Sequence, residues 1–324
     1  MELYDNLLDT MGNTPLVRLS RYSPTGATLA VKVESFNPGS SVKDRIGINM
    51  IEVAEAEGKL TPGMTIVEPT SGNTGVGLAI AAILKGYKLV CTCADKIPPE
   101  KIALLEAYGA TVHTCPTSVA ADDPRSYYKV AERIRDEEGA FLPYQYYNQA
   151  NPEAHYKTTG PEIWRQTDGR ITHWVAGIGT GGTISGTGKY LKEKNPDIRV
   201  IGVDPVGSVY AHFRKHGELP PDEQIHQYLI DGIGEDLMPD SVWFDYIDDV
   251  ITIDDQTAYD AVGEVAQTEA IFTGSSGGAA AAGARMVARD LPEDALVVTL
   301  FPDSGERYLS KINQEWMRAN GLID

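Results

Sequence analysis

Short apolar segments alternate along the chain with longer segments in which apolar residues recur every three or four positions. The first pattern is typical of buried β-strands and the second of amphipathic helices. The patterns predict strands at 14–19, 29–34, 64–68, 88–93, 111–114, 172–176, 199–204 and 295–301. They predict helices after Lys43 and at 75–84, 99–108, 126–138, 153–164, 183–194, 257–269 and 278–289. Residues 207–235 have few periodic signals, and no element is predicted there.

Helices that alternate with short apolar strands indicate right-handed βαβ units and a parallel, doubly wound sheet. A second series of such units begins near Asn151, so we predict an α/β protein with two doubly wound halves. Ligands of such folds bind in crevices at the carboxyl ends of the strands. We therefore expect a ligand cleft between the two halves.

Composition and charge narrow the classes of partner. A chain of 324 residues suits two domains, and 42% hydrophobic with 23% charged residues is ordinary for a globular protein. The formal net charge of −18 argues against binding to nucleic acid, which needs cationic side chains. The longest apolar run, Val76 to Leu84, is too short to cross a bilayer, and the first residues lack signal-peptide features. We expect a cytoplasmic protein that acts on small molecules.

The three cysteines form a sparse, odd-numbered set, which does not suit a disulfide framework. Cys91 and Cys93 alternate on one predicted strand, and His113 and Cys115 on the next, so a four-ligand metal site is geometrically allowed. Free cysteine is usually a small buried apolar residue, and this interpretation is favoured. No metal is predicted.

The segment Asn37 to Arg45 places Lys43 where a Pro-Gly turn gives way to a helix. The amino end of a helix carries partial positive charge, which disfavours a second cation. Such a field helps to keep an amine uncharged, as an amine nucleophile or a Schiff-base lysine requires. Taken alone, the segment fits a solvated surface lysine better. Three glycine-rich turns further along the chain favour the reactive amine.

The first of these turns runs from Glu68 to Gly75, between a predicted strand and a predicted helix. Its backbone N–H groups and the hydroxyls of Thr70, Ser71 and Thr74 are suited to an anion, either a carboxylate or a phosphate. A tight strand–helix connection would explain the glycines but not so many donors.

The second turn has a competing interpretation. Gly177, Gly179 and Gly182 satisfy G-x-G-x-x-G, and Asp204 ends the next predicted strand, so this half also fits a nicotinamide-dependent oxidoreductase. Thr180 and Thr183 add hydroxyls that suit a single terminal phosphate instead.

The third turn, 273–278, is either a plain helix start with serine caps or a neutral hydroxyl presented to a ligand.

Together, the lysine segment and the turns resemble the fold-type II pyridoxal-phosphate enzymes, specifically the cysteine synthase/cystathionine β-synthase family. Ser41–Arg45 matches the Schiff-base lysine motif, Thr70–Thr74 the substrate-carboxylate loop and Gly179–Thr183 the phosphate cup. The resemblance extends from Gly12–Val17 to Pro302–Tyr308. It implies pyridoxal 5'-phosphate as cofactor and a tryptophan synthase β-like architecture. We expect a smaller mobile substrate-loop domain at 37–148, a larger cofactor-phosphate domain at 10–36 and 149–310, and a C-terminal helix or tail at 311–324.

The resemblance also implies the role of each site residue. Lys43 holds the cofactor as a Schiff base and acts as the base at the substrate Cα. Asn73 lies beside the ring hydroxyl, and Ser276 meets the ring nitrogen, with Ser275 as the alternative. The cofactor phosphate is bound by Gly179, Thr180, Gly181, Gly182 and Thr183. The amino-acid carboxylate is bound by Thr70, Ser71, Thr74 and Gln145.

Within the family, Asp95–Lys101, Asp231–Asp236 and Ser310–Met317 resemble the cystathionine β-synthase branch, whereas Thr158–Trp164 also resembles cysteine synthases. The first branch implies a hydro-lyase that condenses L-serine with L-homocysteine through an aminoacrylate to give L-cystathionine. It also implies hydrogen sulfide release when cysteine replaces serine. The alternative is an O-acetylserine sulfhydrylase, which makes cysteine from O-acetylserine and sulfide. Glu235 is either a receiver of the second substrate's amine or an exposed acid.

The family further implies a homodimer. Some of its members carry a haem-binding segment before the catalytic core and a regulatory domain pair after it. Because the chain begins so close to Lys43 and ends soon after Tyr308, we expect neither here.

Overall fold

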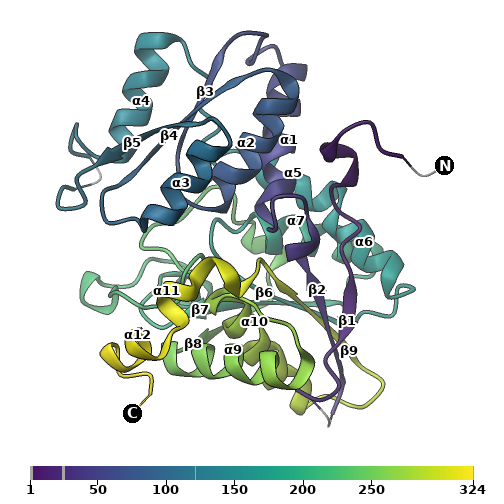
Figure 1. Ribbon diagram of the computed structural model, residues 1–324. Helices are drawn as coiled ribbons and strands as arrows, with labels where there is room; N and C mark the ends of the chain where they lie inside the picture. Colours follow the sequence, from purple (N-terminus) through teal and green to yellow (C-terminus); the bar gives the residue numbers. More distant parts are fainter. Residues whose placement is uncertain (1–2, 24–25, 121, 324) are drawn as a thin grey trace. The chain divides into compact units, whose positions relative to one another are not determined.

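The computed structural model describes residues 3–23, 26–120 and 122–323 (Figure 1). The described residues form two compact units. Unit 1 contains those of 1–11 and 37–154, and unit 2 those of 12–36 and 155–324. The predicted domain boundary at 148 and the predicted mobility of the smaller domain stay predictions.

Unit 1 is built around a parallel three-stranded sheet with the order β3-β4-β5. Its strands are β3 (Thr65–Pro69), β4 (Lys88–Ala94) and β5 (Thr111–Cys115). Its helices are α1 (Lys43–Ala56), α2 (Asn73–Lys85), α3 (Pro99–Ala107), α4 (Tyr127–Glu138), most of α5 (Ala150–Lys157) and the 3-10 helix η1 (Leu7–Thr10). Figure 1 shows α4 on one side of these strands and α1, α2 and α3 on the other.

Alternation along the strands of unit 1 gives each face its own hydrophobic core. On β3, Ile66 packs with α1 and α2, whereas its neighbour Val67 packs with Val130 and Ala131 of α4. Leu89 of β4 belongs to the first cluster. Because successive side chains of a strand point to opposite faces, a strand that is buried on both faces has a continuous apolar sequence.

Unit 2 contains a six-stranded sheet with the order β1-β2-β9-β6-β7-β8, in which only the β1–β2 pairing is antiparallel. The strands are β1 (Leu16–Arg18), β2 (Thr28–Val33), β6 (His173–Gly177), β7 (Arg199–Pro205), β8 (Asp249–Ile253) and β9 (Leu296–Phe301). The α-helices are α6 (Thr159–Gln166), α7 (Gly182–Lys194), α8 (Tyr210–His216), α9 (Asp255–Glu269), α10 (Ser275–Arg289), α11 (Leu309–Ile312) and α12 (Gln314–Ala319). The 3-10 helices are η2 (Glu34–Phe36), η3 (Asp222–Gln224), η4 (Phe244–Tyr246) and η5 (Gly305–Tyr308).

Helices cover both faces of the unit 2 sheet. Gly283 of α10 lies against Val203 of β7, whereas Gly188 of α7 lies against Val200 of the same strand. Since the two valines are three positions apart, they point to opposite faces, and so α7 and α10 lie on opposite sides of the sheet. The predicted α/β class with mostly parallel, doubly wound sheets is confirmed.

Three features differ from the sequence prediction. The helix predicted at 153–164 is two helices, α5 and α6, separated at Thr158 with φ −126° and ψ −66°. Pro161 explains the break, because its ring would clash with the carbonyl of Lys157 in a continuous helix. Helix α8 lies in the segment where no element was predicted, and β8 was missed because it is a short edge strand bordered by aspartates.

Helices α1 and α2 approach each other so closely that only glycine fits at the crossing. A Cβ atom at Gly77 of α2 would lie 2.7 Å from the carbonyl oxygen of Lys43, and one at Gly47 of α1 would lie 2.5 Å from the carbonyl carbon of Gly77. These separations are shorter than van der Waals contact. Helix α2 is therefore in backbone contact with the residue that begins α1.

This contact predicts that Gly77→Ala destabilises the protein. Overpacking costs about 1–3 kcal/mol, which exceeds the gain of about 1 kcal/mol in helix propensity. We expect a lower urea midpoint by circular dichroism. The matched control is Gly263→Ala in α9, where a Cβ meets no atom within 4 Å, and where the same substitution should raise the midpoint. Equal midpoint shifts for the two variants would contradict the packing argument.

Candidate functional site

Lys43 is the first residue of α1, as the sequence predicts. The turn before it is held by the fully buried carboxylate of Asp44, which accepts the N–H groups of Gly39 (2.6 Å) and Ser41 (3.5 Å). The Ser41 hydroxyl oxygen in turn accepts the N–H of Lys43 (3.2 Å). The lysine backbone is thus fixed by a buried network at a helix start, while its side chain is only partly buried.

The turn between β3 and α2 carries Thr70 and Ser71 and leads into the helix at Asn73, which Thr74 follows. The Thr74 hydroxyl donates to Oε1 of Gln145 (2.7 Å), so the structure brings two of the predicted substrate-binding residues together. With Oε1 occupied, the Nε2 group of Gln145 is the half of the amide that can donate to a ligand. The first backbone N–H groups of α2 have no acceptor within the helix, and they favour an anion at the same place.

The backbone of Gln145 is hydrogen-bonded to Glu68, a residue for which the sequence suggested no role. The carboxylate of Glu68 is fully buried and accepts the N–H groups of Tyr144 (2.7 Å) and Gln145 (3.1 Å). Burial raises the pKa of Glu68 from 4.5 to about 7, and the two backbone N–H donors oppose this shift.

In unit 2, the predicted phosphate cup is the loop between β6 and α7, and its binding of a phosphate stays a prediction. Gly181 has φ +85° and precedes the first residue of α7, and Val242 fills the space beside its Cα. The Gly179 carbonyl accepts the Tyr210 hydroxyl (2.5 Å), and the Thr180 carbonyl accepts the Ser241 hydroxyl (2.5 Å). With the carbonyls bonded to the protein, the N–H groups at the start of α7 are available to an anion.

A buried histidine supports this cup. His155 is 1% exposed, and its Nε2 lies 3.2 Å from the Thr183 hydroxyl oxygen, while its Nδ1 lies 2.8 Å from that of Thr159. The imidazole ring therefore fixes the Thr183 hydroxyl by a hydrogen bond. The sequence placed His155 in a helix but gave no signal for this contact, because His155 and Thr183 are far apart in the chain.

The turn 231–234 connects the cup with the third glycine-rich turn. Gly234 donates its N–H to the Ile178 carbonyl (2.7 Å), and Asp231 donates its N–H to the hydroxyl oxygen of Ser275 (2.9 Å). Ser276, next to Ser275 at the start of α10, is also buried. Lys311 of the C-terminal segment binds both carboxylate oxygens of Asp231 at 2.8 Å, which ties that segment to the same turn.

The residues fit a phosphorylated, ring-shaped cofactor. The cup is lined by glycines and hydroxyls at the start of α7, and a side chain at Gly179 would collide with the carbonyl of Gly232. Such a loop binds a terminal phosphate through backbone N–H groups. The acid that a dinucleotide site would need, Asp204, is instead fully buried and accepts the N–H of Ala211 at the start of α8.

The three cysteines are buried, and burial raises the pKa of Cys91 to about 12. His113, two residues before Cys115, is exposed. The described residues contain no group of three or more histidine, cysteine or acidic side chains placed to hold a metal ion. None of the helices in this part of the chain combines the length and apolar character that a bilayer crossing requires.

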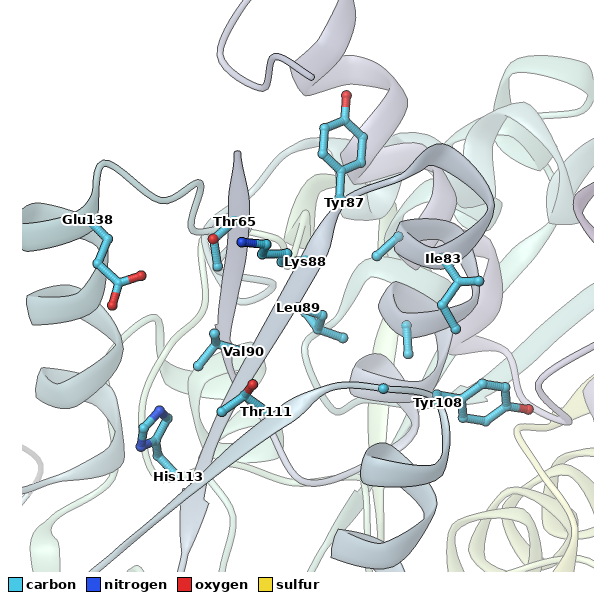
Figure 2. Close-up of a pocket in the computed structure, with 13 residues that line it drawn as sticks. Thr65, Ile83, Tyr87, Lys88, Leu89, Val90, Tyr108, Thr111, His113 and Glu138 are labelled. Carbon is cyan, nitrogen blue, oxygen red and sulfur yellow. The ribbon is translucent and has the colours of Figure 1, made fainter. Parts of the chain in front are cut away.

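A pocket of about 520 Å³ lies at the opposite end of the unit 1 sheet from the Thr70–Thr74 turn (Figure 2). It is lined by the first residues of the three strands, Thr65, Lys88 and Thr111. Figure 2 shows Glu138 and His113 on one side of the strands and Ile83 and Tyr108 on the other. The pocket contains none of the predicted site residues, and ligands of parallel sheets bind at the carboxyl ends of the strands.

Comparison with known proteins agrees with this geometry. The chain matches the family model of pyridoxal-phosphate-dependent enzymes over residues 7–303. It is 38% identical to a cystathionine β-synthase of Apis mellifera over 99% of this chain and 64% of that protein, so it spans less than two thirds of that relative. It is 42% identical to a cysteine synthase of Staphylococcus aureus over 94% of this chain and 96% of the relative. The crystal structure of an O-ureido-L-serine synthase, 38% identical, superposes with a TM-score of 0.87 over 95% of this chain and 94% of that one.

These matches confirm the resemblance inferred from the motifs and exclude the nicotinamide-dependent alternative. They also confirm the predicted cofactor. The chain belongs to the family of pyridoxal-phosphate-dependent enzymes, and pyridoxal 5'-phosphate is its cofactor.

Proposed function

We propose that the protein catalyses β-replacement on an amino acid, condensing L-serine with L-homocysteine to give L-cystathionine, and that it releases hydrogen sulfide when cysteine replaces serine. The observation that carries this proposal is the arrangement of unit 1. A lysine begins α1, and a carboxylate-binding turn begins α2, and these helices are in backbone contact at Lys43 and Gly77. An anion site suits the carboxylate of an amino acid, and a lysine amine suits the proton transfers at its Cα.

The substrate carboxylate binds to the turn that starts α2. Thr70 and Ser71 offer hydroxyls, and Gln145 offers the Nε2 group left by its bond to Thr74. The N–H groups at the helix start add donors that are fixed before the substrate arrives. Such preformed donors orient the Cα–H and the β-substituent without further ordering cost.

Lys43 moves the protons. When bound, pyridoxal phosphate supplies an electron-withdrawing ring that makes the substrate Cα–H acidic. The amine of Lys43, the first residue of α1, removes that proton from Cα as the base. Hydroxide is a poor leaving group, so we assign to the same amine the delivery of a proton to the departing serine hydroxyl. The thiol of the second substrate then adds to Cβ, and we assign to Lys43 the transfer of the thiol proton to Cα, which restores the Cα–H bond.

The remaining predicted residues would hold the cofactor. Gly179, Thr180, Gly181, Gly182 and Thr183 would bind its phosphate, and Asn73 would bind its ring hydroxyl. Ser276 is assigned to the ring nitrogen, because the Ser275 hydroxyl already accepts the N–H of Asp231 and is hydrogen-bonded to the Tyr259 hydroxyl. A neutral hydroxyl does not hold the ring nitrogen protonated as a carboxylate would, which favours replacement at Cβ over transamination.

The choice of substrates rests on the turn 231–236, which resembles the cystathionine β-synthase branch and contacts both the phosphate cup and Ser275. The alternative is an O-acetylserine sulfhydrylase, which is favoured by the match to a cysteine synthase over nearly its whole length. The cytoplasmic location and the homodimer stay predictions.

A product assay tests the substrate assignment. The purified protein, supplied with pyridoxal phosphate, is given L-serine or O-acetylserine together with homocysteine or sulfide, and the products are identified by mass spectrometry. We expect kcat/KM for serine with homocysteine to exceed that for O-acetylserine with sulfide by about tenfold or more, an advantage of about 1.4 kcal/mol. A higher value for O-acetylserine with sulfide would establish the alternative.

A second prediction concerns the phosphate cup. Gly181→Ala places a methyl group against Val242 and in a left-handed conformation, so we expect about tenfold weaker binding of pyridoxal phosphate, measured by equilibrium dialysis. Gly217→Ala is the matched control, since Gly217 has φ +77° and no atom within 4 Å of an added Cβ. Both variants carry about 1–2 kcal/mol of backbone strain. An equal loss of cofactor affinity in the two would show that strain, and not the cup, is responsible.

A further inference from the structure

Glu68 is a carboxylate buried directly behind the substrate-binding residues of unit 1. It is the fourth residue of β3, and none of its surface is exposed. Its two oxygens accept from two successive backbone N–H groups, Oε2 from Tyr144 and Oε1 from Gln145. Hydrogen bonds to an ionised acceptor are about twice as strong as neutral ones.

The segment that donates these N–H groups is conformationally strained. Tyr144 has φ +55°, a left-handed conformation that costs a residue other than glycine about 1–2 kcal/mol. Successive N–H groups in such a conformation converge on one anion. The carboxylate of Glu68 fills that position and stabilises the strained turn.

Gln145 is fixed at three points by hydrogen bonds. Its N–H is held by Glu68, its carbonyl accepts from Nδ2 of Asn151 (2.9 Å), and its side-chain Oε1 accepts from Thr74 (2.7 Å). Together these contacts aim the Nε2 group of Gln145. The contact with Glu68 is the one of the three that an added proton would change.

We propose that Glu68 is a positioning residue for the amino-acid substrate, whose ionised carboxylate holds the Tyr144–Gln145 turn so that Gln145 receives the substrate carboxylate, and whose protonation loosens that turn. The inference rests on the proposed carboxylate site at Thr70–Thr74 and Gln145. A protonated carboxyl group offers one good acceptor instead of two, so one of the two N–H groups loses its partner.

The surroundings of Glu68 place its titration near neutral pH. Burial raises its pKa to about 7, and the bonds from Gln145 and Tyr144 only partly oppose this. Its cross-strand neighbour Cys91 has a pKa raised to about 12, first by burial and then by the charge of Glu68, and the pKa of the Tyr144 phenol is raised as well. Both groups are therefore neutral near pH 7, and no cation among the described residues contributes to the shift at Glu68.

The linkage has an unusual sign. Because the folded-state pKa lies above the ordinary value of 4.5, the folded protein keeps a proton that the unfolded chain loses between about pH 4.5 and pH 7. The contribution of Glu68 to stability therefore decreases as pH rises through this window and is lowest above pH 7. The two hydrogen bonds hold the turn, but they do not offset the cost of burying the charge, so ionisation of Glu68 lowers overall stability, which is consistent with a role in binding.

The test compares Glu68→Gln with the unmodified holoenzyme. L-alanine, which has no β-leaving group, is titrated at several pH values from 6 to 8.5, and its Kd is taken from the change in cofactor absorbance. Glutamine imitates the protonated carboxyl group, so the ratio of the variant's Kd to that of the unmodified protein should be about tenfold at pH 8 and approach one at pH 6. The ratio cancels the titration of the L-alanine amine.

Two variants separate the possible outcomes. Glu55→Gln is the matched control, because Glu55 also accepts two hydrogen bonds in unit 1, from Lys85 and Tyr87, and should give a ratio of one throughout. Gln145→Ala should weaken L-alanine binding at every pH. If it does so while Glu68→Gln has no effect, the carboxylate site stands and the role of Glu68 is wrong. If neither variant has an effect, both the proposed carboxylate site and the proposed role of Glu68 are wrong. A ratio below one at pH 8 would mean that the charge of Glu68 repels the ligand, which also contradicts the proposal.

If Glu68→Gln does not fold, the unmodified protein provides the test. The plot of log Kd against pH for L-alanine should change slope near pH 7, and the plot for L-alaninamide, which lacks the carboxylate, should not. A plot without a change of slope for L-alanine would overturn the inference. Turnover of serine or O-acetylserine is measured separately, so a failure of the proposed reaction is not confused with a failure of the Glu68 inference.

Discussion

Each predicted site segment lies where a helix begins, and this placement is the constraint from which the rest follows. Lys43 starts α1, Asn73 starts α2, Gly182 starts α7 and Ser275 starts α10. The first N–H groups of a helix have no acceptor within it, and they carry partial positive charge. Donors of this kind favour a carboxylate at the start of α2 and a phosphate at the start of α7, which are the anions that the sequence predicts there.

Close backbone approach within each unit places these helix starts against neighbouring segments. In unit 1, glycines at 47 and 77 allow α2 to touch the first residue of α1. In unit 2, Gly179 lies against the carbonyl of Gly232, and the turn 231–234 reaches both the phosphate cup and the start of α10. Buried polar side chains then fix the turns: Asp44 before Lys43, Glu68 behind Gln145 and His155 behind Thr183. These buried residues fix the turns that carry the predicted ligand-binding groups.

The sequence was sufficient for the alternation of strands and helices, for the parallel sheets and for the glycine-rich turns, because periodicity and turn chemistry are local properties. It was insufficient where the local signal was weak, and also where a distant contact decides the outcome. The break between α5 and α6 depends on how Pro161 meets the preceding turn, and the edge strand β8 has too short a pattern to detect. Glu68 and His155 have no local signature, since each is defined by a partner at least 28 positions away in the chain.

The most direct test of the account is the covalent attachment of the cofactor. The protein is saturated with pyridoxal phosphate, reduced with borohydride, digested and mapped by mass spectrometry. The account predicts a visible absorbance band that reduction bleaches, and a single modified peptide in which the cofactor is joined to the Nζ atom of Lys43. A protein that stays colourless with the cofactor, or a modification at another lysine, would contradict the account.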